Sequence, residues 1–141
     1  MGRVLPLLLA LTLGAGCAGP GPALKSQSGP SLPMTAEALK GSWKGSWFAD
    51  GGSVGGFELR IDEVKGDLAS GTGAWHDTVV GTAPFRFEGK LAENELRVEF
   101  SRDYWFRLRL YRPRSEHAEL AGRYSTVGRG VVFTGEILLS R

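Results

Sequence analysis

Length, composition and charge restrict the classes of protein to which this chain can belong. Its 141 residues are 42% hydrophobic and 23% charged, which fits one small globular domain and is too short for two well-built cores. Seventeen basic and fifteen acidic side chains leave a formal net charge of +2, too weak a balance for a nucleic-acid-binding protein. With one Cys and two His, the sequence offers neither a structural zinc site nor a disulfide framework, so we expect no metal and no cofactor.

The amino terminus has the pattern of an export signal. Residues 4–13 are nearly all apolar and follow Arg3, and this run is about half as long as a membrane-spanning helix. The sequence Leu13-Gly14-Ala15-Gly16-Cys17 comes next, and its Cys is the single one in the chain. This sequence resembles the lipobox of bacterial lipoproteins, in which the Cys becomes the lipid-modified first residue.

The lipobox resemblance implies a cellular location. Residues 1–16 would be a lipoprotein signal peptide, and Cys17 would carry the lipid that attaches the protein to a membrane. Ala18 stands where an Asp commonly retains lipoproteins at the inner membrane. We therefore expect a lipid anchor in the outer membrane, with the domain on the periplasmic side or exposed at the cell surface. A plain secretory signal cut near Ala15 or Ala18 is the alternative.

Residues 17–40 are expected to join the lipidated Cys to a folded domain. The stretch 18–33 is made largely of Gly, Pro and Ser and has almost nothing to bury, which predicts a flexible, disordered tether. Residues 35–40 can form one helical turn that leads into the domain.

From residue 41 to residue 141 the sequence predicts a single all-β domain. Apolar and polar residues alternate in eight short runs, at 41–49, 54–64, 68–76, 82–91, 95–101, 104–112, 118–125 and 131–140. The breaks between them are short and rich in turn residues, so neighbouring strands must be antiparallel. We predict an eight-stranded antiparallel up-and-down β-barrel, because closure removes the exposed edges of an open sheet.

The alternation also predicts a register for the fifth and sixth strands. If Phe100 is opposite Phe106, then Val98 is opposite Leu108 and Leu96 is opposite Leu110. In this register Glu99 faces Arg107 on the outside of the barrel. A slip of one residue would bring an arginine into the interior, which burial forbids.

The start of the first predicted strand, Gly41-Ser42-Trp43, resembles the Gly-x-Trp motif of the calycin group, which includes lipocalins, fatty-acid-binding proteins and avidins. In that group the Trp plugs one end of the barrel and commonly stacks with a basic side chain from the last strand. The resemblance implies a calycin-like barrel in which Trp43 is the plug and Arg141 is its cation–π partner.

Aromatic residues dominate the predicted interior of the barrel. An eight-stranded barrel is just wide enough to be filled by side chains or to hold one small ligand. The same rings would fill the core in the first case and line a cavity in the second, and the sequence does not separate the two. A ligand cavity would open at the end opposite Trp43. Its candidate lining residues are Trp47, Phe57, Phe85, Phe87, Phe100, Tyr104 and Phe106.

A second functional hypothesis uses the outside of the barrel. Trp105, Arg107, Arg109 and Tyr111 lie on one face of the sixth strand, and this combination of residue types is typical of protein interfaces. The face would suit an envelope protein as partner, for example an enzyme that the domain inhibits. A solvated face whose arginines pair with acidic neighbours is the competing interpretation.

We expect no catalytic site. His76 and Asp77 are adjacent in a predicted strand, and neighbouring strand residues point to opposite faces. The sequence therefore predicts a non-enzymatic protein that binds a small apolar ligand or a protein partner.

Overall fold

The computed structural model describes residues 29–113 and 117–141 of the chain. The predicted signal peptide (residues 1–16), Cys17 and the first part of the predicted tether lie outside the described residues. Within the described ranges, no helix is both long enough and apolar enough to cross a membrane.

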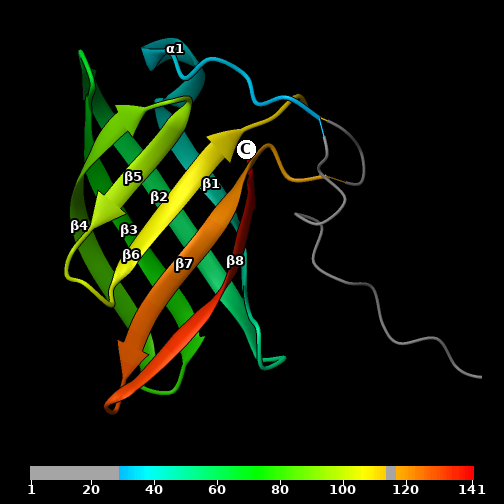
Figure 1. Cartoon of the computed structure of the whole chain (residues 1–141), viewed down its shortest axis with the longest axis vertical. Helices are drawn as coiled ribbons and strands as arrows, with labels where there is room; N and C mark the ends of the chain where they lie inside the picture. Colours follow the sequence, from blue (N-terminus) through cyan, green and yellow to red (C-terminus); the bar gives the residue numbers. More distant parts are fainter. Residues whose placement is uncertain (1–28, 114–116) are drawn as a thin grey trace, which may run out of the picture.

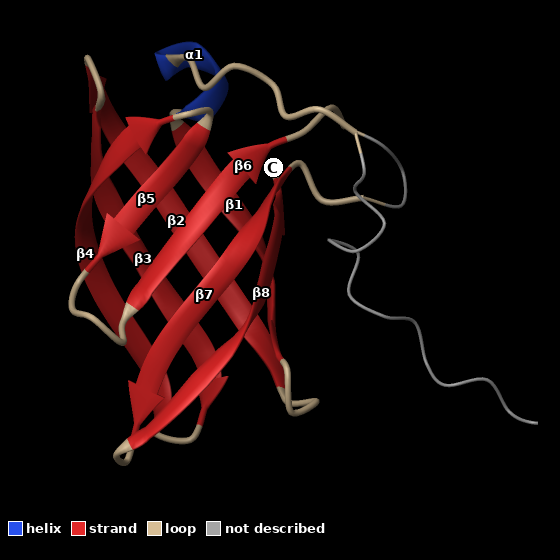
Figure 2. Ribbon diagram, viewed as in Figure 1, coloured by secondary structure: helices blue, strands red, loops and turns tan. Residues whose placement is uncertain are grey.

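Eight antiparallel strands form a closed barrel, as predicted (Figures 1 and 2). The strands follow one another around the barrel in chain order, and the last pairs with the first. A short helix, α1 (Ala36–Leu39), precedes them. The strands are β1 (Gly41–Ala49), β2 (Val54–Lys65), β3 (Leu68–Thr78), β4 (Gly81–Ala92), β5 (Glu95–Glu99), β6 (Trp105–Leu110), β7 (Leu120–Gly128) and β8 (Val131–Ser140). Each strand begins and ends within three residues of its predicted boundary.

The two faces of the sheet are separated as the alternation predicts. In β2, Phe57, Leu59 and Ile61 are at most 1% exposed, whereas the intervening Glu58 and Arg60 are exposed. Successive side chains of a strand point to opposite faces, so one set enters the barrel and the other meets solvent. The apolar core therefore lies inside the barrel, and charged side chains cover much of its outside.

The predicted register of β5 and β6 is wrong by two residues. Val98 pairs with Phe106, and Leu96 pairs with Leu108. The turn sets this register, because the backbone N–H of Phe100 donates to the carbonyl oxygen of Tyr104 at 2.9 Å and their rings stack at 4.3 Å. A shift of two residues keeps every side chain on its predicted face, and for this reason alternation alone could not detect it. Glu99 is opposite Trp105, and its carboxylate still lies 3.4 Å from Arg107, now on the diagonal.

One end of the barrel is closed by Trp43 and α1. Thr35 caps α1, and its hydroxyl accepts a hydrogen bond from the Ala38 N–H. Trp43 is 1% exposed, and its indole N–H donates to the carbonyl oxygen of Leu39 at 2.9 Å. The Arg141 guanidinium lies 4.5 Å from the centre of the Trp43 ring and also donates to the carbonyl oxygen of Ala38. The cation–π contact implied by the calycin resemblance is therefore present.

Glycines allow the strands of this narrow barrel to approach one another closely. A Cβ atom added to Gly122 would collide with the backbone carbonyl of Arg107 on the neighbouring strand β6. At Gly71 and Gly135 an added Cβ would meet the carbonyl oxygens of Arg60 and Phe48 in the same way. Because a backbone carbonyl held in a ladder cannot move aside cheaply, these positions exclude every larger residue.

We predict that Gly122→Ala lowers the free energy of unfolding by about 2–3 kcal/mol or more, because the methyl group forces β6 and β7 apart. Gly51→Ala is the matched control. Gly51 is exposed in the turn between β1 and β2, and an added Cβ there meets nothing within 4 Å, so we expect a change within about 0.5 kcal/mol. Urea denaturation of the two variants measures both values. Equal effects would contradict the proposed collision.

Candidate ligand-binding cavity

The middle of the barrel is filled by aromatic side chains. The ring centres of Phe57, Phe85 and Phe106 lie 5.8 Å from one another, and Phe87 lies 6.1 Å from Phe106. Phe57 and Phe106 are completely buried. These four residues were expected to line a cavity, and the structure places them in the packed part of the interior instead, outside the cavity lining. Eight strands enclose too little width for four rings and a ligand at the same level.

The other end of the barrel is hollow. A cavity of about 240 Å³ lies there, and it reaches the ends of β3 and β4 at Val79 and Val80 and those of β7 and β8 at Val127 and Phe133. These connections lie at the end away from α1 and Trp43 (Figure 1). This is the position that the ligand-binding hypothesis requires.

Four aromatic residues form much of the inner wall of the cavity. Trp47 and Tyr104 line it, as the sequence predicted, and Trp75 and Tyr124 join them. The Trp47 indole N–H donates to the carbonyl oxygen of His76 at 2.8 Å, and the Trp75 N–H donates to the Tyr104 hydroxyl at 3.1 Å. Both indole N–H groups are therefore satisfied by the protein, and the indoles are left to offer apolar surface.

Tyr124 is the most deeply buried polar residue of the cavity wall. It is 1% exposed and packs edge-on against Trp75, with ring centres 4.9 Å apart. Burial raises the pKa of Tyr124 to about 12, with the negative charge of Asp50 adding to the effect and Arg123 opposing it. Burial also raises the pKa of Tyr104, and the hydrogen bond from Trp75 opposes that rise. Both phenols are therefore neutral near pH 7.

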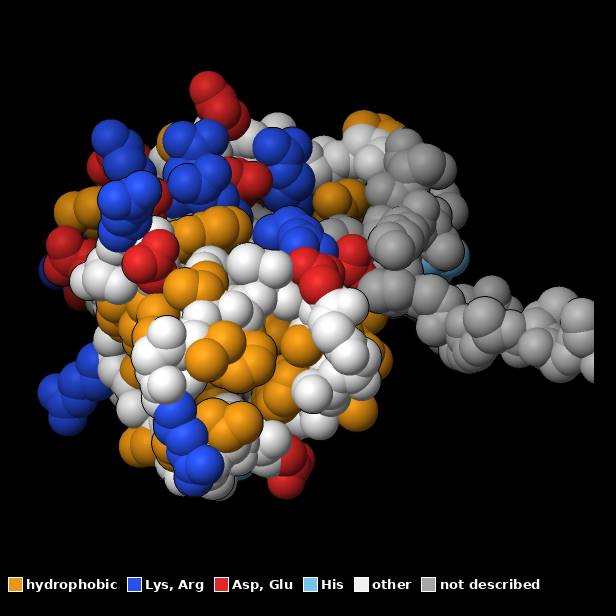
Figure 3. All heavy atoms as spheres, turned by 60° about the horizontal axis from the view of Figure 1, so that its bottom comes forward, with side chains coloured by type: hydrophobic (Ala, Val, Ile, Leu, Met, Phe, Trp, Pro, Cys, Tyr) orange, Lys and Arg blue, Asp and Glu red, His pale blue; other side chains and the backbone are white. Residues whose placement is uncertain are grey.

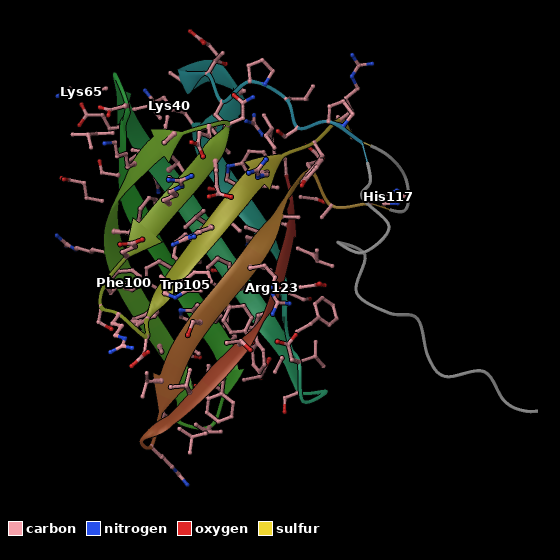
Figure 4. The ribbon with its side chains drawn as sticks, in the orientation of Figure 1. Lys40, Lys65, Phe100, Trp105, His117 and Arg123 are labelled. Carbon is pink, nitrogen blue, oxygen red and sulfur yellow. The ribbon has the colours of Figure 1, made fainter. Side chains whose placement is uncertain are left out.

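Phe100 and a group of valines surround the mouth of the cavity. The described residues include eight exposed large hydrophobic side chains, and seven of them lie in or beside the turns that join β1 to β2, β3 to β4, β5 to β6 and β7 to β8. They are Phe100 and the six residues that we call the valine rim, namely Val54, Val79, Val80, Val127, Val131 and Val132. Figure 3 shows apolar side chains gathered over this end, with most of the charged side chains toward the opposite one. Phe100 was predicted to line the cavity and is instead 37% exposed in the turn between β5 and β6, where its ring stacks on that of Tyr104 (Figure 4).

The predicted protein-binding face on β6 is engaged in contacts within the barrel. The Arg107 guanidinium lies 4.9 Å from the centre of the Trp105 ring and 3.4 Å from the Glu99 carboxylate. Arg109 pairs with Glu95 at 3.2 Å. Tyr111 is partly exposed and uses its backbone N–H to bind the carbonyl oxygen of Glu119. The arginines thus have acidic neighbours, as the competing interpretation of this face requires.

His76 and Asp77 are separated by the wall of the barrel. The two strands β3 and β4 change register between Trp75 and Thr78, and Asp77 adopts a φ of 57°. This bulge turns Asp77 toward the mouth of the cavity, whereas the His76 ring lies outside, 3.3 Å from the Thr82 hydroxyl. Among the described residues there is no group of three or more His, Cys, Asp or Glu that could hold a metal ion.

Two cavity residues that were absent from the predicted lining nevertheless have a signal in the sequence. Trp75 follows Gly71 and Gly73 at spacings of two, so the alternation in β3 puts it on the inner face. Tyr124 follows Leu120 and Gly122 in the same way on β7. Val79 and Val80 have no such signal, because they lie in a connection whose course depends on the bulge.

Comparisons with known proteins identify no relative. The chain matches no protein-family model, no curated protein and no solved structure.

We predict that Tyr124 ionises near pH 12, and that phenolate absorbance of the wild type shows a transition there that is absent from Tyr124→Phe. A raised pKa in the folded state means that the neutral phenol stabilises the fold. This contribution is complete below the ordinary pKa of 10 and is lost as the pH rises from 10 through 12. The loss amounts to up to about 2–3 kcal/mol and should be absent from Tyr124→Phe. An equal loss of stability by the wild type and Tyr124→Phe between pH 10 and pH 12 would contradict the raised pKa of Tyr124.

Proposed function

We propose that this protein is a non-enzymatic binding protein whose barrel takes up one small apolar ligand through its open end. The observation that carries the proposal is the cavity of about 240 Å³ at the end opposite Trp43, lined by Trp47, Trp75, Tyr124 and rim valines. Small-molecule sites are typically concave and mainly apolar, with few polar groups. The packed aromatic side chains in the middle of the barrel close the inner end of this cavity.

The volume sets the size of the ligand. An engineered apolar cavity of about 150 Å³ holds benzene, so a cavity of about 240 Å³ suits about ten non-hydrogen atoms, the size of a fused bicyclic molecule. At roughly 0.5–0.8 kcal/mol per atom, such a ligand would bind with a Kd between about 1 and 200 µM.

The alternative function, binding of an envelope protein through Trp105, Arg107, Arg109 and Tyr111, has less support. Arg107 and Arg109 are already paired with acidic side chains of β5. A partner would have to replace those pairs, and the Glu95 side chain, which is only 13% exposed, would lose its contact with Arg109.

We predict that 1-fluoronaphthalene binds the wild type, with a shifted and broadened fluorine NMR signal, and that Ala83→Leu weakens this binding at least tenfold. Ala83 is an inward residue of β4 that lines the cavity, so a leucine there occupies space that the ligand needs. Ala74→Leu is the matched control, because Ala74 lies on β3 beside the cavity residue Trp75 but on the outer face.

Equal binding by the two leucine variants would place the probe outside the cavity. No binding by a wild type with native circular dichroism would overturn the proposed function.

We further propose that the protein is attached to the outer membrane by a lipid on Cys17, with the domain on the periplasmic side or at the cell surface. The apolar run at residues 4–13 and the sequence that ends in Cys17 support this. The course of the chain is compatible with it. The backbone N–H of Leu32 donates to the carbonyl oxygen of Leu110 at 2.7 Å, near the closed end of the barrel. The described part of the chain therefore joins the barrel at the end away from the mouth.

We predict that Cys17→Ala abolishes labelling by a radioactive fatty acid and moves the protein from the membrane fraction to the soluble fraction, because the thiol is the acceptor of the lipid. Ser31→Ala, in the same tether, should leave both properties unchanged. Membrane association that survives Cys17→Ala would refute the lipid anchor.

A further inference from the structure

We infer that the ligand is a neutral, compact molecule that carries a hydrogen-bond acceptor, and that the hydroxyls of Tyr124 and Tyr104 bind this acceptor. The inference rests on the proposed ligand-binding function and adds the chemical class of the ligand. It starts from two phenolic O–H groups in a largely apolar cavity.

Tyr124 lines the cavity, and its hydroxyl has no acceptor among the residues that the structure describes. The residue as a whole is 1% exposed, but its hydroxyl oxygen is not one of the fully buried polar atoms that lack a partner. A hydrogen bond from this donor to a ligand acceptor would contribute about 0.5–1.5 kcal/mol.

Tyr104 presents a second donor beside the same indole ring. The Trp75 N–H donates to the Tyr104 oxygen at 3.1 Å, so this oxygen already acts as an acceptor. The phenol proton of Tyr104 then remains for another acceptor, and none is present among the described residues. The ring centres of Tyr104 and Tyr124 lie 6.5 and 4.9 Å from that of Trp75. Both phenol rings therefore lie close to the same indole.

The charges of the cavity favour a neutral ligand. The lining contains no Lys or Arg, so a buried anion would find no counter-charge. Both phenols are neutral near pH 7, as ordinary tyrosines are, and burial raises the pKa of each further, so they act as donors rather than as negative charges. Asp77 is the one acidic group of the lining, and it is exposed to solvent at the mouth, where water screens its attraction for a cation.

The test compares four probes that share a fused bicyclic ring system by their displacement of 1-fluoronaphthalene in fluorine NMR at neutral pH. Naphthalene has no acceptor, isoquinoline has one neutral acceptor, N-methylisoquinolinium has a positive charge in its place, and 2-naphthoate has a negative charge. We expect Tyr124→Phe to weaken isoquinoline binding by roughly three- to tenfold, the value of one hydrogen bond, and to change naphthalene binding less than twofold. Tyr104→Phe should act in the same direction.

Tyr111→Phe is the matched control. Tyr111 lies outside the cavity lining, and removal of its hydroxyl should leave the affinities for all four probes unchanged. The wild type should bind isoquinoline more tightly than either charged probe.

Three outcomes would decide against the inference. Loss of affinity for naphthalene and isoquinoline alike in Tyr124→Phe would show that the hydroxyl acts through the packing of the wall. Unchanged affinity for both would show that it recognises nothing. Tighter binding of N-methylisoquinolinium than of isoquinoline would assign the cavity to a cation. By contrast, a folded wild type that binds neither 1-fluoronaphthalene nor any probe would overturn the proposed function itself.

Discussion

Closure of the sheet by the pairing of β8 with β1 governs the architecture of the whole domain. The pairing runs from Lys44 opposite Ser140 to Ala49 opposite Gly135. It gives every strand a partner on both sides, and it also sets the width of the interior. The inward side chains must then share a narrow space along the barrel axis. The narrow barrel also requires glycines such as Gly122, because neighbouring backbones come too close there for any Cβ.

Within that width, the sizes of the inward residues decide which level is filled and which is hollow. Trp43, held by Leu39 and Arg141, occupies the closed end, and a cluster around Phe57 and Phe106 occupies the middle. Near the open end the inward positions of β4 and β7 are taken by Ala83 and Gly128, and space remains beside the rings of Trp47 and Trp75. The cavity thus results from small residues that follow large ones on the same inner faces, and the two filled levels give it a rigid floor.

The fold was predictable to a large extent because its signals are local. Alternation over five to twelve residues defines a strand, and short turns permit only antiparallel neighbours. The pairing of β5 with β6 was predicted two residues out of place, because the stacking of Phe100 on Tyr104 across the turn sets it and alternation is unchanged by a step of two. The candidate site was predicted less well. Trp47 and Tyr104 line the cavity as expected, whereas Phe57, Phe85, Phe87 and Phe106 belong to the packed core. Phe100 lies in the turn between β5 and β6 and stacks on Tyr104.

Periodicity and turn residues along the chain were enough to specify the all-β class, the eight strands, and the inward and outward faces. The contact between Trp43 and Arg141 was implied by the resemblance of Gly41-Ser42-Trp43 to the calycin motif. Whether the aromatic residues fill the barrel or line a cavity was settled only in the folded barrel. The height of a ring along the barrel axis depends on strand register and tilt summed over the whole sheet, and neither is encoded at any one position. For the same reason, the approach of Tyr104 and Tyr124 to Trp75 depends on the packing together of β3, β7 and the turn before β6, and not on their spacing in the chain.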